Sequence, residues 1–469
     1  MRTDSTRFIA AAALCFAPLA AGSQADPSLK LGSNSSTATA EFRAGITDFQ
    51  NISFESAAAH FKAAVDADPA FGLARVLYAS AAPLAPEQQA TEVNRGVADA
   101  ARASVNELVI AAAYREALLG HTDAANALFR AAAQMMPRDQ LLAWNAIGGF
   151  GAPLATVQEF VTQHPNYALG YNMLAYQAWN GGNPAAALAA AKRQVELEPN
   201  APNPHDTYAE ILQFNGNFAE AAAHYRQAAA LPPKFPEAYV GLAEVAALQG
   251  QYDQARTYLN QAIANAWTPQ QKLGYLRQIA GTYALQGAPT DQTARALEAA
   301  IAEAKSQGDA RSTAILYSQL ATVQANAGNV SAAHQSIAQA SGGPDVPWNV
   351  RYYAAMAHGL MKHWAPAGQQ LAALKTQAAA NAGSVPPAPL AALEAYLQTQ
   401  QGKPADALTI LMAADTTNAL VMSRIAEAHA ALGHTSEAAA WNNRINTNYA
   451  IALGDFTNVN SRRRARPRR

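Results

Sequence analysis

The stretch HDTYAEILQFNGNFAEAAAHYRQAAALPPK, residues 205–234, decides the fold because its features return at a fixed distance on either side. Its central glycine, Gly216, lies 34 residues after Gly182 and 34 residues before Gly250. An aromatic residue or a proline follows each of these glycines by two positions, and an alanine follows each by five. A fixed period of this length is typical of repeat proteins, in which one supersecondary unit stacks on the next.

Each unit is predicted to form two antiparallel helices. The glycine ends the first helix because it adopts a positive φ angle at little cost. The second helix runs about 14 residues to a proline, Pro199 or Pro233, which cannot continue it. Half of the residues are hydrophobic, alanine runs are frequent, and the alternation typical of strands is almost absent. The sequence therefore predicts an all-α fold, an α-solenoid of stacked helix hairpins.

The repeat resembles the tetratricopeptide repeat family, whose 34-position frame has small residues where the two helices touch. Ala175 and Ala243 take that place in the first helix of two units, and Ala255 takes it in a second helix. The resemblance is clearest over residues 165–265 and extends with less regular spacing over 41–445. It implies roughly ten to twelve helix-turn-helix units in a superhelix. A break at the Gly- and Pro-containing residues 341–347, or alternatively one at 381–389, would divide the superhelix into two lobes.

The N-terminal segments differ from the repeat region. Residues 1–25 begin with a short basic stretch, continue with an apolar run too short to span a bilayer, and end in small residues that suit cleavage. They predict a signal peptide, and hence an exported, soluble protein that is periplasmic or secreted. The only cysteine, Cys15, lies in this segment, so that the mature chain lacks disulfides and thiolate metal sites. Residues 26–40, rich in Ser, Thr and Asn, predict a flexible linker.

The C-terminal segment, residues 446–469, ends in the tail SRRRARPRR, which is predicted to be disordered. The tail holds six arginines and no acidic residue, whereas the rest of the chain is acidic. It suits an anionic surface of the envelope, nucleic acid, or the acidic groove of its own or a neighbouring chain. Export and the lack of interleaved aromatic residues argue against nucleic acid. A solvated tail without a contact is a further alternative.

No catalytic, metal or cofactor motif stands in the sequence. It lacks H-E-x-x-H, G-x-S-x-G and a phosphate-binding glycine loop. The histidines recur at corresponding places of the repeat, as residues of a structural template do. His205 takes a helix-packing position beside Asp206, so the two are not expected to form a dyad. His358 and His363 are five residues apart, which predicts different faces of one helix rather than a zinc pair. We predict no enzyme activity, catalytic residue, metal or cofactor.

The resemblance also implies a concave groove lined by the first helix of each unit. The positions that face it are aromatic in one unit and acidic in the next two. The candidates for partner binding are Asn172, Tyr176, Trp179, Asp206, Glu210, Gln213, Glu237 and Glu244. The Lys, Asn and Arg residues with which one subfamily clamps a C-terminal carboxylate are missing. A basic or neutral protein or peptide segment therefore suits the groove, with Tyr176 and Trp179 as anchors.

Together these features predict a non-catalytic protein- or peptide-binding scaffold or adaptor of the bacterial cell envelope. One alternative is a glycan- or lipid-associated binding module that assists an envelope enzyme or assembly, since aromatic groove residues also suit sugars. A second alternative is a weakly catalytic solenoid that uses the region of His358 and His363. The sequence specifies neither the partner nor the oligomeric state.

Overall fold

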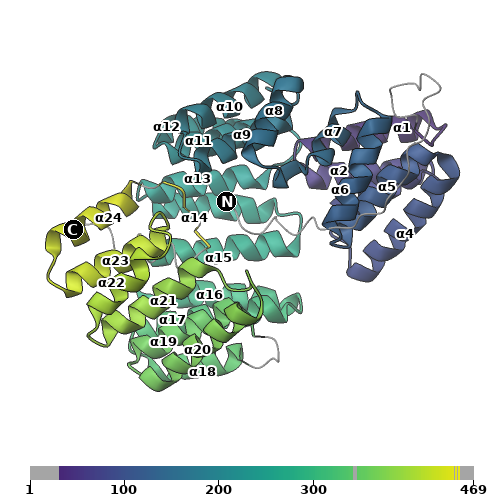
Figure 1. Ribbon diagram of the computed structural model, residues 1–469. Helices are drawn as coiled ribbons and strands as arrows, with labels where there is room; N and C mark the ends of the chain where they lie inside the picture. Colours follow the sequence, from purple (N-terminus) through teal and green to yellow (C-terminus); the bar gives the residue numbers. More distant parts are fainter. Residues whose placement is uncertain (1–30, 342–345, 448, 452, 455–469) are drawn as a thin grey trace. The chain divides into compact units, whose positions relative to one another are not determined.

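The computed structural model describes residues 31–341, 346–447, 449–451 and 453–454. Within these ranges every regular element is a helix and none is a strand (Figure 1). The prediction of an all-α fold is therefore confirmed. The predicted signal peptide, the first five residues of the predicted linker and the arginine tail lie outside the described residues.

The described chain forms two compact units. Unit 1 comprises the described residues up to Leu212 together with Ala219–Ala238. Unit 2 comprises Gln213–Phe218 and the described residues from Tyr239 onward. The division falls inside the clearest repeats, and neither of the two breaks considered from the sequence lies at it.

The helices from the start of the described chain up to the last residues of unit 1 have the following bounds. They are α1 (Ser36–Gln50), α2 (Phe54–Ala67), α3 (Gly72–Ala81), α4 (Pro86–Ala103), α5 (Val105–Leu118), α6 (Thr122–Met135), α7 (Gln140–Ala146), the 3₁₀ turn η1 (Gly149–Gly151), α8 (Leu154–Gln163), α9 (Ala168–Asn180), α10 (Pro184–Leu197), α11 (Pro202–Phe214) and α12 (Phe218–Ala230).

The helices that follow belong to unit 2, apart from the first turn of α13. They are α13 (Pro236–Leu248), α14 (Tyr252–Ala264), α15 (Pro269–Gln286), α16 (Thr290–Ser306), α17 (Ala310–Asn326), α18 (Val330–Ala340), α19 (Trp348–Leu360), α20 (Trp364–Ala380), α21 (Pro387–Gln400), α22 (Pro404–Met412), α23 (Ala419–Ala431) and α24 (Thr435–Asn446).

The three clearest repeats have the predicted register. Their first helices, α9, α11 and α13, start 34 residues apart, and so do their second helices, α10, α12 and α14. Gly182, Gly216 and Gly250 lie in the turns between the paired helices with φ angles of 74°, 80° and 80°. The prediction that these glycines close the first helix through a positive φ angle is therefore confirmed.

Alanine occupies the positions where the paired helices were expected to touch. Ala175 and Ala243 in the first helices and Ala255 in a second helix are all 0% exposed. The side chains of the core thus leave no room beyond a methyl group at these places, which is how close-packed interiors behave.

Replacing Ala255 by leucine is expected to lower the free energy of unfolding by about 1–3 kcal/mol. The three added carbons have to displace neighbours in a filled core. Chemical denaturation followed by circular dichroism measures the change. Ala264→Leu, at the exposed end of the same helix α14, is the control and is expected to leave the midpoint unchanged. An Ala255→Leu variant as stable as the native chain would contradict the register.

Downstream the period lengthens because the helices lengthen. Helices α9, α11 and α13 have 13 residues each, whereas α15 has 18 and α16 and α17 have 17 each. Gly287 and Gly328 still end α15 and follow α17 with φ angles of 73° and 79°. The turn chemistry of the repeat is therefore kept where its spacing is not.

Helix α1 begins inside the segment that was predicted to be a linker. The hydroxyl of Ser35 accepts a hydrogen bond from the backbone N–H of Ala38 at 3.2 Å and so caps the helix. Ala38 and Phe42 are buried on its inner face. The linker prediction is therefore wrong for residues 36–40, because Ala38 is their only buried residue and gives no apolar stripe to recognise.

An aromatic cluster replaces the alanine packing in the less regular part of unit 1. Trp144 in α7 lies 5.3 Å from the ring of Phe160 in α8 and 6.0 Å from the ring of Tyr167, which precedes α9. Phe160 and Tyr167 are 5.4 Å apart in an edge-to-face arrangement. The three large rings thus fill the space between short helices, α7 and α8, that have only seven and ten residues.

Candidate functional site

The predicted groove residues of unit 1 are joined across two neighbouring first helices. The side-chain amide of Asn172 on α9 donates to the hydroxyl of Thr207 on α11 at 2.7 Å. One turn further along α9, the hydroxyl of Tyr176 donates to the carboxylate of Glu210 on α11 at 2.6 Å. These bonds fix the polar face of α9 against that of α11, so the residues have a structural role whatever else they bind.

One predicted groove residue of unit 2, Gln213, contacts the segment that follows α24. Gln213 Nε2 lies 3.3 Å from the Glu244 carboxylate on α13 and 3.3 Å from the backbone oxygen of Tyr449. Gln213 is 0% exposed. A residue that was predicted to contact a partner therefore contacts a segment of its own chain.

Burial separates the eight candidates into two groups. The half-buried ones are Tyr176, Trp179 and Glu237, and the buried ones are Asn172, Asp206, Glu210, Gln213 and Glu244. Three of the buried side chains are carboxylates, and a buried carboxylate is stable only where polar groups compensate for the lost water. The half-buried side chains are thus the more accessible places for a partner. Whether any of the eight binds one stays a prediction.

The residues that contact Gln213 and α15 from the C-terminal side were not predicted. Tyr449, Ile451 and Leu453 follow the last helix, α24, and Ile451 and Leu453 are buried in the core of unit 2. The sequence carried one signal for this segment, since apolar side chains stand at every second position from 449 to 453. The prediction of disorder concerned only the arginine tail, and no structure was predicted for the residues between α24 and that tail.

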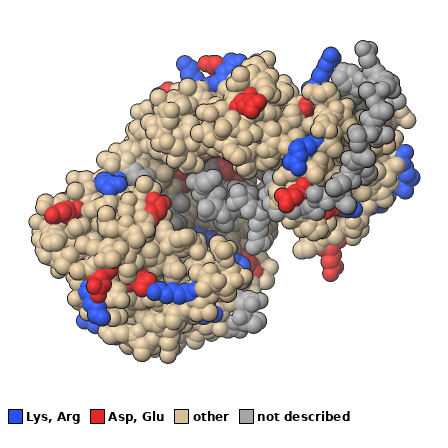
Figure 2. Space-filling model, in the orientation of Figure 1, with Lys and Arg blue, Asp and Glu red and all other residues tan. Residues whose placement is uncertain are grey.

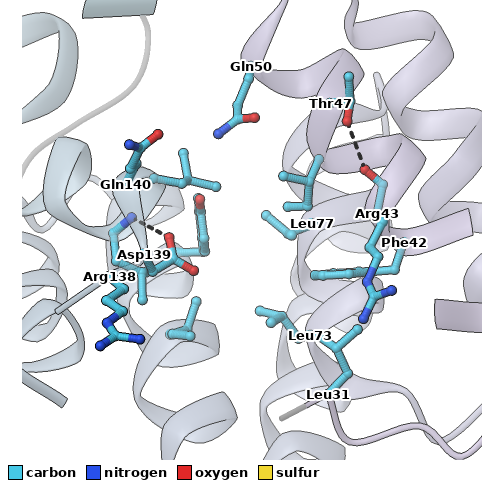
Figure 3. A pocket seen from close by; sticks show the side chains of 15 residues that line it. Leu31, Phe42, Arg43, Thr47, Gln50, Leu73, Leu77, Arg138, Asp139 and Gln140 are labelled. Carbon is cyan, nitrogen blue, oxygen red and sulfur yellow. Dashed lines mark hydrogen bonds between the residues drawn. The ribbon is translucent and has the colours of Figure 1, made fainter. Parts of the chain in front are cut away.

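Unit 1 also contains a cleft of about 560 Å³ (Figure 3). Helices α1 and α3 line one side, and α5 with the start of α7 lines the other. The lining is largely apolar, and it includes two arginines, Arg43 on α1 and Arg138 before α7. Asp139 beside Arg138 is occupied with capping α7, because its carboxylate accepts from the backbone N–H of Leu142 at 3.0 Å. The cleft therefore offers apolar walls with two cations.

Charged side chains are sparse on the face in Figure 2, and lysines or arginines alternate there with aspartates or glutamates. This agrees with the low charged fraction of the sequence, 14%. The ion pairs are mostly local, such as Lys62 with Asp66 one helical turn away at 2.7 Å. Such exposed pairs contribute little to stability.

His358 and His363 do not share a helix, so the prediction that they lie on different faces of one helix is wrong. His358 lies in the last turn of helix α19, and His363 is the N-cap residue of α20. The reversal between them passes through Lys362, whose φ angle is 59°. His334 from α18 joins them, with its ring stacked on His363 at 5.2 Å. Among the described residues no group of three or more His, Cys, Asp or Glu is arranged to hold a metal ion.

His205 packs against another histidine rather than acting with Asp206. Its Nε2 lies 2.9 Å from the carbonyl oxygen of Pro199 and therefore donates. Its Nδ1 lies 3.0 Å from Nδ1 of His224, and the two rings stack 5.2 Å apart. A neutral His205 with its proton on Nε2 must accept at Nδ1, so His224 donates there. The pair is satisfied only while at least one ring is neutral.

Unit 1 is expected to lose stability as the pH falls below about 6.5, the ordinary pKa of histidine. Burial, followed by the neighbouring His205, lowers the pKa of His224, against an opposing pull from Glu220. The unfolded chain therefore takes up the proton first, so the contribution is fully present above pH 6.5 and declines below it. Thermal unfolding at pH 7.5 and pH 5.5 measures the loss, and His224→Tyr is expected to reduce it. An equal pH dependence in both proteins would refute this assignment.

The paired antiparallel helices of the described residues define a class of protein, the all-α proteins built from helix hairpins. Residues 214–270 match a family model described as tetratricopeptide repeat, in the region where the repeat is clearest. This match shows a tetratricopeptide repeat within residues 214–270. Among the helices of the described part, none has the length and apolar run needed to cross a membrane.

Parts of the chain are similar to solved structures. The crystal structure of MamA is 18% identical, covers 36% of this chain and 97% of its own, and has a TM-score of 0.29. The thermophilic tetratricopeptide repeat protein TTC0263 of Thermus thermophilus is 22% identical, with 36% and 97% covered and a TM-score of 0.31. A second MamA structure is 14% identical, with 49% and 91% covered and a TM-score of 0.23. No curated protein matches the sequence significantly.

Proposed function

We propose that the chain is a non-catalytic scaffold or adaptor of the bacterial cell envelope that binds protein or peptide segments. The observation that carries this proposal is the non-helical segment around Tyr449 and Leu453, which contacts the predicted groove residue Gln213 of unit 2 through the backbone oxygen of Tyr449. A surface that already accommodates a short peptide of this chain is suited to peptides of a partner. The matching tetratricopeptide repeat supports the same function.

The half-buried Trp179 provides the test in unit 1. A photo-crosslinking residue at position 179, in cells that express the full chain, is expected to capture one or a few discrete proteins. The same residue at position 105, where Val105 is 68% exposed at the start of α5, is the control and should capture none of them. The captured protein is then purified, and Trp179→Ala should weaken its binding by tenfold or more. Equal binding by the folded Trp179→Ala variant would overturn the proposal.

The alternative function, a lipid-associated binding module, is favoured by one observation, the cleft of unit 1. Apolar walls with Arg43 and Arg138 suit an amphiphile with an anionic head (Figure 3). A fluorescent fatty acid binds the purified chain if this function is correct, and Ile46→Asp in the cleft wall should abolish the signal. A chain that binds no fatty acid at physiological salt would exclude the alternative.

The arginine tail is proposed to make a weak contact with an anionic surface of the envelope. Six arginines provide the charge for such a contact, which is electrostatic and therefore sensitive to salt. Vesicles with and without anionic lipid, tested against a chain in which the tail arginines are replaced by serine, distinguish this contact from a solvated tail.

A further inference from the structure

Three large apolar residues that follow α24 contact unit 2 as the side chains of a peptide ligand would. Ile451 and Leu453 bury their side chains in the core of unit 2, and Leu453 is 0% exposed. The ring of Tyr449 lies edge-on to that of Phe218, 5.0 Å away. These large apolar side chains stand at every second position, and Ile451 and Leu453 belong to the same core cluster.

The backbone of the segment is contacted as well as its side chains. Gln213 Nε2 lies 3.3 Å from the carbonyl oxygen of Tyr449, and a guanidinium nitrogen of Arg277 lies 3.5 Å from that of Gly454. Contacts to main-chain oxygens do not depend on the sequence of the bound segment, whereas apolar pockets select its side chains. This combination is how peptides are recognised on many protein surfaces.

Two glycines of the solenoid make room for the segment. A Cβ at position 281, on α15, would overlap the carbonyl oxygen of Leu453. A Cβ at position 216 would lie 2.8 Å from the ring of Tyr449. Gly274, on the same helix α15, has open space where its Cβ would be. Glycine at 281 is thus required by the bound segment and not by the helix, in which glycine is destabilising.

We propose that this surface is a peptide-binding site and that the segment around Tyr449, Ile451 and Leu453 is its built-in competitor. The inference rests on the proposed function and names the chemistry of the partner. The partner is a non-helical peptide that has one aromatic and two aliphatic residues at alternate positions, in that order, followed by a glycine. Such a partner replaces the chain's own segment, so the free surface is available only after that segment leaves. The test must distinguish a segment that a partner can displace from one that is a permanent part of the core.

The test uses the full chain and a fluorescent peptide, TNYAIALGDF, with the sequence of residues 447–456. The native chain is expected to bind it weakly, because its own segment fills the site. Leu453→Asp should expel that segment, since a carboxylate is not tolerated at a fully buried position without partners, and should bind the peptide at least tenfold more tightly. Tyr449→Ala, a milder change, is the second variant, and circular dichroism establishes that both fold. A peptide in which the apolar residues are moved off the alternate positions is the control ligand.

The paired glycines give the matched controls. Leu453→Asp combined with Gly281→Ala should lose the added affinity, because the methyl group obstructs the peptide backbone. The combination with Gly274→Ala should retain it. The proposal is overturned if folded Leu453→Asp and Tyr449→Ala chains bind the peptide no better than the native chain does. In that case, the proposed scaffold function is still supported if the protein that crosslinks at position 179 binds the purified native chain. If that protein does not bind, the scaffold function is overturned as well.

Discussion

Trp144→Ala is expected to lower the free energy of unfolding of unit 1 by about 3–5 kcal/mol. The indole is 2% exposed and lies between the rings of Phe160 and Tyr167, at 5.3 and 6.0 Å. Its removal leaves a cavity bordered by short helices, which have few other contacts to compensate. The loss therefore includes both the transfer of a large apolar group and the unfilled space. Edge-to-face contacts with neighbouring rings add to the loss.

Denaturation by urea, followed through helix content, measures this loss as a shift of the first transition. Phe150→Ala is the matched control, because Phe150 also lies edge-on to Trp144, at 5.9 Å, but is 46% exposed. Its removal creates no closed cavity, and the expected cost is about 1 kcal/mol or less. Equal shifts for the two variants would mean that the aromatic cluster does not hold this part of the unit together.

Leu259→Ala is expected to destabilise unit 2 by about 2–5 kcal/mol. Leu259 is 0% exposed on α14 and belongs to the main core of the unit. It follows Ala255 by one helical turn on the same face, so both residues face the paired helix of their repeat. The alanine needs little volume at its position and the leucine fills the space beside it. Removing the leucine side chain therefore opens a cavity in a contact that every regular repeat has to make.

Leu432→Ala in the same unit is the control. Leu432 is 36% exposed beyond the end of α23, so its truncation should cost about 0.5 kcal/mol. Both variants replace leucine by alanine, so the difference between their unfolding midpoints gives the contribution of burial at position 259. Unfolding free energies that differ by less than about 1 kcal/mol would exclude Leu259 from the core of the repeat.

The repeat could be predicted from the sequence because its signals are local. A glycine with a positive φ angle, two helices of near-constant length and an alanine at the crossing all lie within 34 residues, and Gly216 with Ala255 illustrates each kind of signal. The longer helices α15 to α17 were harder to predict from the sequence, because added helical turns change the repeat period without changing the residue types. The start of α1 at Ser36 was missed because its inner face bears mostly small residues.

The candidate site was predicted less completely, since it depends on contacts between residues far apart in the sequence. The family frame indicated which helix face Tyr176, Glu210 and Gln213 occupy. It did not indicate that Tyr176 and Glu210 bond to each other, or that Gln213 contacts a residue 236 positions away. The acidic side chains are buried together with these contacts. A sequence pattern shows their charge but not their burial, and it therefore predicts an exposed acidic surface.

Gly281 has a consequence for related sequences. As long as the C-terminal segment occupies its place, no residue with a side chain fits at this position. A substitution there and the loss of the apolar alternation after α24 should therefore be inherited together. Among future homologues, sequences that keep both features would share the built-in competitor, and sequences that lack both would have a permanently open surface. We therefore expect positions 281 and 453 to change together in related sequences, and this pair would then distinguish members that have the built-in competitor from members that lack it.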